Sequence, residues 1–432
     1  MKKYLLVLVF VLIGSIAAYA QNTPKCATDI ILKEKLDSEP ALRAIYLQQQ
    51  EILKQQTEAR LHTAARTNAG PRVIPVVFHV LLNQAQMTQI LDTAGVNKRI
   101  VSQLAALNRD YNNQNADLAN VPAPFQSKIG NANLVFKLAH RDPQGNSTSG
   151  VDIVLQNSTK DGFFVGSGTE RRADQGGVNA WDSSHYLNIW VVNITGFAGI
   201  LGFTISPNKE LVLNQVRGIT LAYGALGQNY GNQGYFITDA DSGRTLTHEV
   251  GHFFELEHIW GIQNDCSDDD GVGDTPKQAT SDFGCPNFPK FDACTPSGDG
   301  IMFMNYMDYC VDRCLLMFTN GQVARMNTSL DNGNSILNES GDLTEWPNAV
   351  NNLTLQSELS IYPNPSNGIF TVNTSEQLQR ITVVSLTGEM VMQQQLNGQR
   401  NIQIDLSDKA KGIYAVQCQY AEGTVTRKIN IQ

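Results

Sequence analysis

The chain has 432 residues, of which 42% are hydrophobic, and carries a formal net charge of −9 at pH 7. A chain of this length is expected to form more than one domain, and its hydrophobic content suffices for packed cores. The sequence holds no block of Lys or Arg and no acidic tail. Composition therefore excludes a basic nucleic-acid-binding protein and a disordered acidic arm.

The first twenty residues have the organisation of a secretory signal peptide. Lys2 and Lys3 form a short basic region, Leu5 to Ile13 is apolar, and AYA at 18–20 is a small-residue cleavage site. A membrane anchor is the alternative, but the apolar run is short for a spanning helix and no second long run follows. We therefore predict cleavage after Ala20 and export, which makes disulfides permissible.

Residues 21–66 are rich in Gln, Glu, Lys, Arg and Ala, and we interpret them as a propeptide. Within this segment, residues 40–62 are expected to form a polar helix with a thin apolar stripe of Leu42, Ile45, Leu53 and Leu61. A breaker cluster follows at 67–71 and places the end of the propeptide near Arg66. The alternative is that the helix simply extends the next domain.

Strands and helices are mixed through residues 67–347, the expected main domain. Strand-like runs lie at 72–82, 133–139, 187–194 and 199–205, and helical spacing at 94–111 and 243–256. Residues 262–320 form a loop rich in Asp, Gly and Cys. Because the order does not alternate strictly, α/β and α+β folds are both open.

The residue pattern of the chain changes after a linker expected at 348–357. In residues 358–432, short strand-like runs are separated by turn signals at 363–368, 387–388, 397–398, 411–412 and 422–423. Regular punctuation of this kind predicts a small all-β sandwich.

The strongest chemical signal is the stretch THEVGHFFELEHIW at 247–260. His248 and His252 are four residues apart, so on a helix they share one face, and imidazole is a good ligand for zinc. Glu249 lies beside the first ligand, where its carboxylate can act as the base for a water activated by the metal.

His258 lies six residues after His252 and would point away on a continuous helix. The helix must therefore end after about residue 254, so that the chain turns back and presents His258 as a third ligand. Three protein ligands leave the open fourth position that catalytic zinc requires. The alternative, three unrelated histidines, is disfavoured because three of the seven histidines fall in this one stretch beside a Glu.

The long histidine motif resembles that of the metzincins, and NYMDY at 305–309 resembles their methionine turn, with Met307 beneath the zinc. The fuller match is to the pappalysin family, in its small ulilysin-like bacterial members. It is carried by the following stretches between about 72 and 327: IPVVFHVLL, KLAHRDPQGNSTSG, YLNIWVVNI, GRTLTHEVGHFFELEHIW, GDTP and NYMDY followed by Cys314.

This resemblance implies an α+β metzincin fold, with a twisted mixed sheet, an active-site helix and a loop-rich C-terminal subdomain. It also implies zinc-dependent endopeptidase activity, and it places Tyr309 near the zinc, where its hydroxyl can stabilise an oxyanion. The alternative is a tyrosine packed in a loop. One position departs from the pattern: Glu255 stands where metzincins carry Gly, and a non-Gly residue there costs about 1 kcal/mol.

The acidic loop DCSDDDGVGDT at 265–275 is a candidate calcium site. Composition alone favours a solvated loop, whereas the resemblance implies a structural calcium, with Asp270, Val272, Asp274 and Thr275 as candidate ligands.

Seven cysteines are present, five of them between 266 and 314. The resemblance implies the disulfides Cys266–Cys294 and Cys285–Cys314, a pairing that sequence alone cannot fix. Cys310 is then extra, and Cys418, in an expected strand, is most simply a buried thiol.

Cys26 lies in KCATD at 25–29, which resembles the Cys-Gly-Thr-Asp propeptide stretch of family members with Ala27 in place of Gly. A thiolate is a strong zinc ligand, so Cys26 is a candidate latency switch that occupies the open coordination position. A spare cysteine is the alternative.

Asp312 follows the methionine turn closely and is a candidate for the floor of the specificity pocket. A carboxylate there would favour Arg or Lys after the scissile bond, and the arginines near the propeptide junction would suit self-processing. A surface aspartate is the alternative.

Residues 358–432 resemble the C-terminal sorting domain of the type IX secretion system. The resemblance is carried by IYPNP at 361–365, the runs 368–372, 386–388 and 412–416, and Arg427-Lys428. It implies passage through outer-membrane secretion machinery, with removal of the module on secretion. The alternative is a permanent adhesive sandwich.

We therefore expect a secreted or cell-surface metalloendopeptidase, a monomer acting on protein or peptide substrates, with catalytic zinc and structural calcium. The rival is a secreted binding or adhesion protein with a structural zinc, its site silenced by Glu255. Retention of Glu249 argues against that rival, because a structural site does not need this carboxylate. A zinc amidase acting on small substrates is disfavoured by the pappalysin-like flanks.

Overall fold

The computed structural model describes residues 23–62, 70–231, 234–332, 343–345, 359–375, 377–385, 390–420 and 423–432. The chain forms two compact units, residues 1–139 with 149–340 and residues 140–148 with 341–432. The expectations for the signal peptide at 1–20, the junction near Arg66 and the linker at 348–357 lie outside the described residues.

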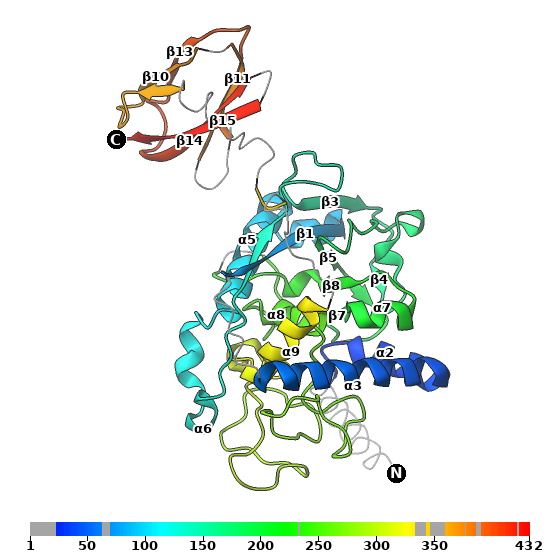
Figure 1. Cartoon of the computed structure of the whole chain (residues 1–432). Coiled ribbons are helices and arrows are strands. Elements are labelled where there is room, and N and C mark those ends of the chain that lie inside the picture. The colour runs from blue at the N-terminus through cyan, green and yellow to red at the C-terminus, as the bar shows by residue number, and fades with distance from the viewer. Residues whose placement is uncertain are drawn as a thin grey trace, which may run out of the picture. The chain divides into compact units, whose positions relative to one another are not determined.

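A six-stranded mixed sheet forms the centre of the first unit, in the order β2-β1-β5-β8-β7 with β3 also paired to β1 (Figure 1). The pairs are parallel except that β7 is antiparallel to β8. β1 is long enough for β2 to pair with its first half and β3 with its second. The strands are β1 (Arg72–Asn83), β2 (Leu134–Leu138), β3 (Val151–Gln156), β5 (Leu187–Val192), β7 (Gly202–Ile205) and β8 (Gly218–Ala222).

The central strands are continuous apolar runs because both faces of this sheet are covered. All six residues of β5 and ten of the twelve in β1 are buried. This burial is typical of parallel strands with helices or loops on both faces. The α+β fold with a mixed sheet is thereby confirmed.

Helices pack against this sheet and position the candidate site. Helix α8 contacts β7 and β8, and α5 contacts both α8 and β2. Capping boxes begin α4 at Asn83 and α9 at Thr319. The helices are α4 (Gln84–Gln89), α5 (Asp92–Asp110), α6 (Ala123–Gln126), α7 (Pro207–Leu213), α8 (Arg244–Phe253) and α9 (Asn320–Asp331).

Shorter elements complete this unit. Two short strands, β4 (Phe163–Phe164) and β6 (Ile194–Thr195), pair in parallel. Single turns of 3₁₀ helix lie at Ala116–Asn120, Thr169–Arg171, Ala173–Gln175, Tyr223–Ala225 and Asp312–Cys314.

Two N-terminal helices lie along this unit, α2 (Thr28–Ser38) and α3 (Pro40–His62). Helix α2 contacts β7 and α7, and α3 contacts α7 and α9 (Figure 1). The helix expected at 40–62 is confirmed, but its expected apolar stripe is wrong in part. Ile45 and Leu61 are exposed, and the buried face is formed by Tyr46, Leu53 and Thr57. Polar groups share this face because α3 packs through hydrogen bonds as well as apolar contacts.

The second unit contains two antiparallel sheets, as the turn signals predicted. One sheet has the order β13-β10-β9 and the other β12-β11-β14-β15. They share one core that includes Val372, Ile381, Val383, Val416 and Ile429. The strands are β9 (Ser360–Tyr362), β10 (Ile369–Asn373), β11 (Leu378–Ser385), β12 (Met390–Gln395), β13 (Asn401–Asp405), β14 (Gly412–Tyr420) and β15 (Gly423–Ile431).

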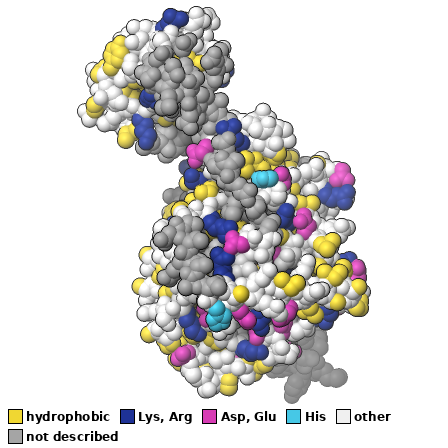
Figure 2. Space-filling view, viewed as in Figure 1, with side chains coloured by type: hydrophobic (Ala, Val, Ile, Leu, Met, Phe, Trp, Pro, Cys, Tyr) yellow, Lys and Arg dark blue, Asp and Glu magenta, His cyan; other side chains and the backbone are white. Residues whose placement is uncertain are grey.

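The face of the molecule shown in Figure 2 carries basic and acidic side chains interspersed with one another. Among the described residues, no helix combines the length and the apolar character that crossing a membrane requires.

Candidate metal centre

Helix α8 carries the first two candidate ligands and ends where the spacing required. Its C-terminal turn is a Schellman motif: the Leu256 N–H donates to Gly251 O and the Glu255 N–H donates to His252 O, each at 3.0 Å. The residue after the cap, Glu255, has a φ of 68°. This left-handed residue turns the chain back, so that His258 returns to the face of α8 that carries His248 and His252.

Glu255 compensates for the absence of Gly at this turn. Its side chain is buried, and one carboxylate oxygen accepts the backbone N–H of Asn208 at 2.9 Å, at the start of α7. Burial raises the pKa of Glu255, and the buried ammonium of Lys209 opposes this rise. The turn carbonyl of Glu255 accepts a hydrogen bond of 2.7 Å from Arg325 Nε. Glu255, which stands where the family pattern has Gly, is thus held by contacts with α7 and Arg325, and His258 keeps its position.

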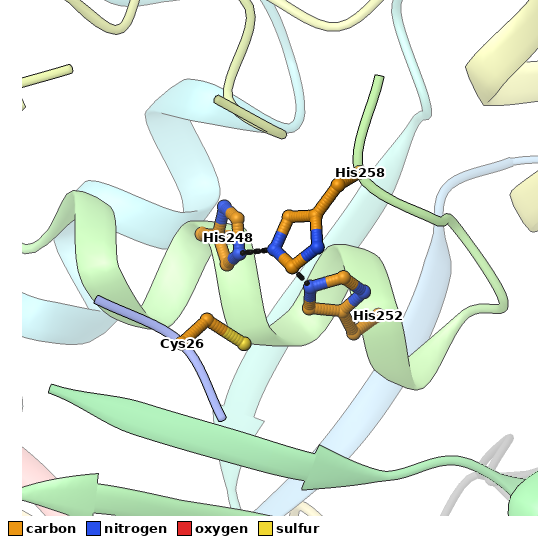
Figure 3. Close-up of side chains that lie close together, drawn as sticks. All are labelled: Cys26, His248, His252 and His258. Atoms are coloured by element: carbon orange, nitrogen blue, oxygen red, sulfur yellow. Dashed lines mark hydrogen bonds between the residues drawn. The ribbon is translucent and has the colours of Figure 1, made fainter. Parts of the chain in front are cut away.

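Three histidines and one cysteine converge on a single point (Figure 3). The Nε2 atom of His258 lies 3.1 Å from Nε2 of His248 and 3.1 Å from Nε2 of His252. With Sγ of Cys26, the ligand atoms of all four residues lie within 4.8 Å of one another, and all four side chains are buried. The structure therefore brings together the three expected zinc ligands and the candidate latency cysteine.

Each imidazole is oriented by an acceptor at its other nitrogen. Nδ1 of His248 lies 2.7 Å from Tyr306 O, and Nδ1 of His252 lies 2.7 Å from Leu256 O. Nδ1 of His258 contacts the carboxylate of Asp29. With protons on these three Nδ1 atoms, the three Nε2 lone pairs face and repel one another. A cation placed between them would remove this repulsion.

The spacing of these nitrogens fits zinc. Zn–N bonds of about 2.0–2.1 Å in a tetrahedron separate two nitrogens by roughly 3.3 Å, close to the observed 3.1 Å. Burial, followed by the neighbouring His258, lowers the pKa of His248 to about 3, and the same causes hold the pKa of His252 well below its usual value. These imidazoles are therefore neutral, the form that binds a metal.

Glu249 lies beside the first ligand and points to the edge of the sheet. Its Oε2 accepts a hydrogen bond of 2.7 Å from Thr204 Oγ1, and burial raises its pKa to about 7. In the described part of the chain, its Oε1 has no hydrogen-bond partner. A Cβ on Gly202 would lie 2.9 Å from Glu249 Cγ, so glycine is needed there for the carboxylate to lie over β7.

Met307 and Tyr309 come from the turn expected to lie beneath the ligands. Met307 is fully buried. Its sulfur lies so close to α8 that a Cβ added to Gly251 would be only 2.6 Å from it. Gly251 is on α8 between the two histidines, so Met307 supports the ligand-bearing helix. The Tyr309 hydroxyl donates to the carbonyl of Cys26 at 3.0 Å, next to the metal ligands.

The segment 25–28 lies across this site and pairs with β7. Leu201 N–H donates to Lys25 O at 2.7 Å, and Ala27 N–H donates to Gly202 O at 3.1 Å. Cys26 is thereby held over the histidines, with its thiol 3.1 Å from Thr28 Oγ1. Burial and the nearby Glu249 raise the pKa of the Cys26 thiol. A bound cation reverses this preference by favouring the thiolate.

Asp312 lies close to the site but is not on the surface. Its Oδ2 accepts the backbone N–H groups of Ser242 at 2.8 Å and Arg244 at 3.1 Å, at the start of α8. A cavity lined by Asp312, Cys310, Leu315 and Thr245 connects it to His248 and Glu249, and Lys25 enters this cavity. Asp312 thus lines a cavity beside His248 and Glu249, and its role in a specificity pocket stays a prediction.

The four candidate calcium ligands are only partly brought together. Asp270 is buried and accepts from Thr275 Oγ1 at 2.8 Å, and Val272 O accepts from the same hydroxyl at 2.8 Å. The two oxygens of Asp274 instead accept from Thr319 Oγ1 at 2.6 Å and from Gly321 N–H at 2.9 Å, at the start of α9.

The disulfides have the pairing that the family resemblance implied, Cys266–Cys294 and Cys285–Cys314. Cys266–Cys294 joins two parts of the long loop, and Cys285–Cys314 ties this loop to the segment after the methionine turn. Cys26, Cys310 and Cys418 are free and buried.

Sequence reasoning missed three contacts that shape this site: Asp29 on His258, Thr204 on Glu249 and Lys25 in the Asp312 cavity. Asp29 had a signal, because it lies in the same short stretch as Cys26. The roles of Thr204 and Lys25 depend on the pairing of segment 25–28 with β7, which no spacing in the sequence reveals.

Residues 170–331 match the family described as pregnancy-associated plasma protein-A, and residues 360–432 match a secretion system C-terminal sorting domain. An extracellular metalloprotease of Arthroderma otae is 45% identical over 89 residues, 21% of this chain and 32% of that protein. One of Arthroderma benhamiae is 29% identical over 287 residues, 64% of this chain and 78% of that protein. The chain spans about half or less of the length of the first curated relatives that it matches.

Two solved structures from Tannerella forsythia are also similar. A promirolysin mutant has a TM-score of 0.62 and 36% identity, covering 72% of this chain and 95% of its own. Mature mirolysin in complex with a cleaved peptide has a TM-score of 0.58 and 39% identity, covering 64% of this chain and 99% of its own.

Proposed function

Because the chain belongs to the pappalysin family of metalloproteases, we propose that it is a secreted zinc-dependent endopeptidase made as a latent precursor. The observation that carries this proposal is the convergence of three Nε2 atoms beside a buried carboxylate. His248, His252 and His258 would hold the zinc. The ion supplies Lewis acidity, which lowers the pKa of a water and polarises the scissile carbonyl.

Glu249 acts as the general base. Its Oε2 is fixed by Thr204, so Oε1 takes the proton of the attacking water and then delivers it to the leaving amine. A pKa near 7 suits both the acceptance and the release of a proton at neutral pH.

Tyr309 stabilises the negative charge that develops on the attacked carbonyl oxygen. Its hydroxyl already donates to a peptide carbonyl next to the ligands, that of Cys26. A substrate carbonyl in the same position would receive the same hydrogen bond, which strengthens as charge develops.

Asp312 gives the enzyme a preference for Arg or Lys after the scissile bond. It is a buried acid that lines one cavity together with His248 and Glu249. Its two hydrogen bonds use only Oδ2, so Oδ1 can pair with a cationic side chain.

Cys26 keeps the precursor latent by occupying the fourth coordination position. Its sulfur lies within 4.8 Å of the ligand atoms of all three histidines, and segment 25–28 fills the edge of β7 that an extended substrate would need. The match to promirolysin covers more of this chain than the match to the mature form, 72% against 64%, as expected if an N-terminal propeptide is shared.

A structural calcium is supported by Asp270, Val272 O and Thr275, which contact one another in the acidic loop. Asp274 would have to exchange its contacts at the start of α9 to join them. A melting temperature that is indifferent to both calcium and a chelator would contradict this part of the proposal.

The C-terminal domain directs the chain to the type IX secretion system. We infer that it passes through the outer-membrane machinery and is removed on secretion. A second candidate function, a binding protein with a silenced site, is favoured only by Glu255, and Glu255 stabilises the turn that presents His258.

The test is casein cleavage by the propeptide-free enzyme beside its Glu249→Ala variant, with zinc measured in both. We expect the variant to keep one zinc and to lose activity by roughly 10²–10⁴-fold, as for removal of a general base. Two inert proteins that both hold zinc would instead favour the binding protein.

A further inference from the structure

Lys25, the residue before the candidate latency cysteine, lines the cavity that Asp312 also lines. Its Nζ donates to the carbonyl of Cys310 at 3.1 Å, on the wall of this cavity. Asp308 and Asp312 line the same cavity, so acidic side chains lie around this ammonium. The ammonium is thus placed in an acidic pocket, although it belongs to the N-terminal segment and not to a substrate.

The backbone of segment 25–27 explains why Lys25 and Cys26 reach different targets. The segment forms a bridge to β7 at Gly202, with hydrogen bonds to the carbonyl of Lys25 and from the N–H of Ala27. Successive side chains of an extended chain point to opposite sides. Cys26 therefore points to the three histidines, while Lys25 points to the Asp312 cavity.

Asp312 is built to receive a cation. It is buried, and its Oδ2 is held by the N–H groups of Ser242 and Arg244 at the start of α8. Burial raises the pKa of Asp312, and these two donors, together with the charges of Lys25 and Arg244, oppose that rise. A buried carboxylate gains from a cation in the same cavity, and in this structure Lys25 and Arg244 both line the cavity with Asp312.

We propose that Lys25 is a built-in competitor of the substrate, which fills the basic-residue pocket of the unprocessed chain while Cys26 occupies the metal. This inference rests on the proposed function and deepens it, because it assigns latency to two adjacent anchors instead of one. Since the anchors are neighbours, each holds the other at high effective concentration. Loss of either should therefore weaken the hold of the whole segment.

The experiment compares activation of full-length precursors carrying Lys25→Met, Lys25→Arg, Lys33→Met and Cys26→Ala. Lys33 is the matched control, an exposed lysine on α2 whose partners are Asp37 and Gln263. We expect Lys25→Met to shorten the activation half-time roughly tenfold, in line with loss of one charged hydrogen bond. Lys25→Arg should stay latent, Lys33→Met should match the wild type, and Cys26→Ala should activate fastest.

A second measurement does not depend on folding of the variant precursors. The peptide TPKCATDI, residues 23–30, is tested as an inhibitor of the propeptide-free enzyme, beside versions with Met for Lys25 and Ser for Cys26. We expect competitive inhibition, and each replacement should weaken it roughly tenfold. A Lys25→Met precursor as latent as the wild type, with equal inhibition by the Lys and Met peptides, would overturn the inference.

Failure of this inference can be told apart from failure of the proposed function. If the propeptide-free wild-type enzyme is inert towards casein, the proposed function fails. If it cleaves casein and peptides before Arg or Lys while Lys25 proves irrelevant, only the competitor role of Lys25 is lost.

Discussion

Glu255 occupies the left-handed position at which many helices end in glycine, with a φ of 68°. The backbone strain there is about 1 kcal/mol for a residue with a Cβ. The buried carboxylate offsets this strain, because it accepts the Asn208 N–H and lies near the Lys209 ammonium. At Glu255, therefore, the backbone strain destabilises the fold and the carboxylate contacts stabilise it. Substitutions can separate these two contributions.

We predict that Glu255→Gly is more stable than Glu255→Ala by about 1 kcal/mol, because only glycine releases the strain. Both variants should be less stable than the wild type by about 1–3 kcal/mol, since the α7 amide loses its acceptor and Lys209, which is paired with Glu257, loses a second nearby negative charge. Urea unfolding of the zinc-loaded, propeptide-free enzyme measures all three. Equal stability of the two variants would mean that the turn relaxes out of the left-handed region when the carboxylate is lost.

At the scale of elements, what could be predicted depended on how local the signal was. The apolar runs predicted β1 and β5, and the histidine spacing predicted both α8 and its end. Helices α2 and α9 and strand β8 had no comparable signal: α2 lies in a polar tract, α9 starts with Asn-Gly, and β8 has only five residues. The contact between Asp29 and His258 joins residues 229 apart, so it follows from the docking of the N-terminal segment and not from any periodicity.

The packing of α8 on the methionine turn gives a prediction at the same scale. A Cβ on Gly251 would lie 2.6 Å from Met307 Sδ. Gly251→Ala should therefore push the methionine away from the helix, at about 1–3 kcal/mol of stability, and weaken zinc binding. Met307→Ala should cost about 2–5 kcal/mol by leaving a cavity.

Because the two side chains compete for one space, the double variant Gly251→Ala with Met307→Ala should be less destabilised than the sum of the single variants. Thermal unfolding of the wild type, the two single variants and the double variant gives the double-mutant cycle that measures this coupling. Strict additivity would show that Met307 does not contact α8 in the manner described.

At the scale of the whole molecule, the chain joins two units with separate hydrophobic cores. The core of the second unit is formed by residues between 359 and 431, and the candidate metal ligands all belong to the first unit. The two family matches follow the same division, at 170–331 and 360–432. A unit with its own core can fold alone, so secretion and catalysis should be separable by truncation.

We predict that a chain ending at residue 357 folds, binds zinc and cleaves casein after activation like the full-length protein, but stays inside a bacterium that has a type IX system. The truncation removes the complete second core and none of the candidate metal ligands. Melting temperature, zinc content and activity of the purified protein test the first part, and immunoblots of cells and medium test the second. A full-length Glu249→Ala chain, found in the medium, controls for effects of proteolysis on export. Export of the truncated chain would show that the sorting domain is dispensable, and an unfolded product would show that the first unit needs the second.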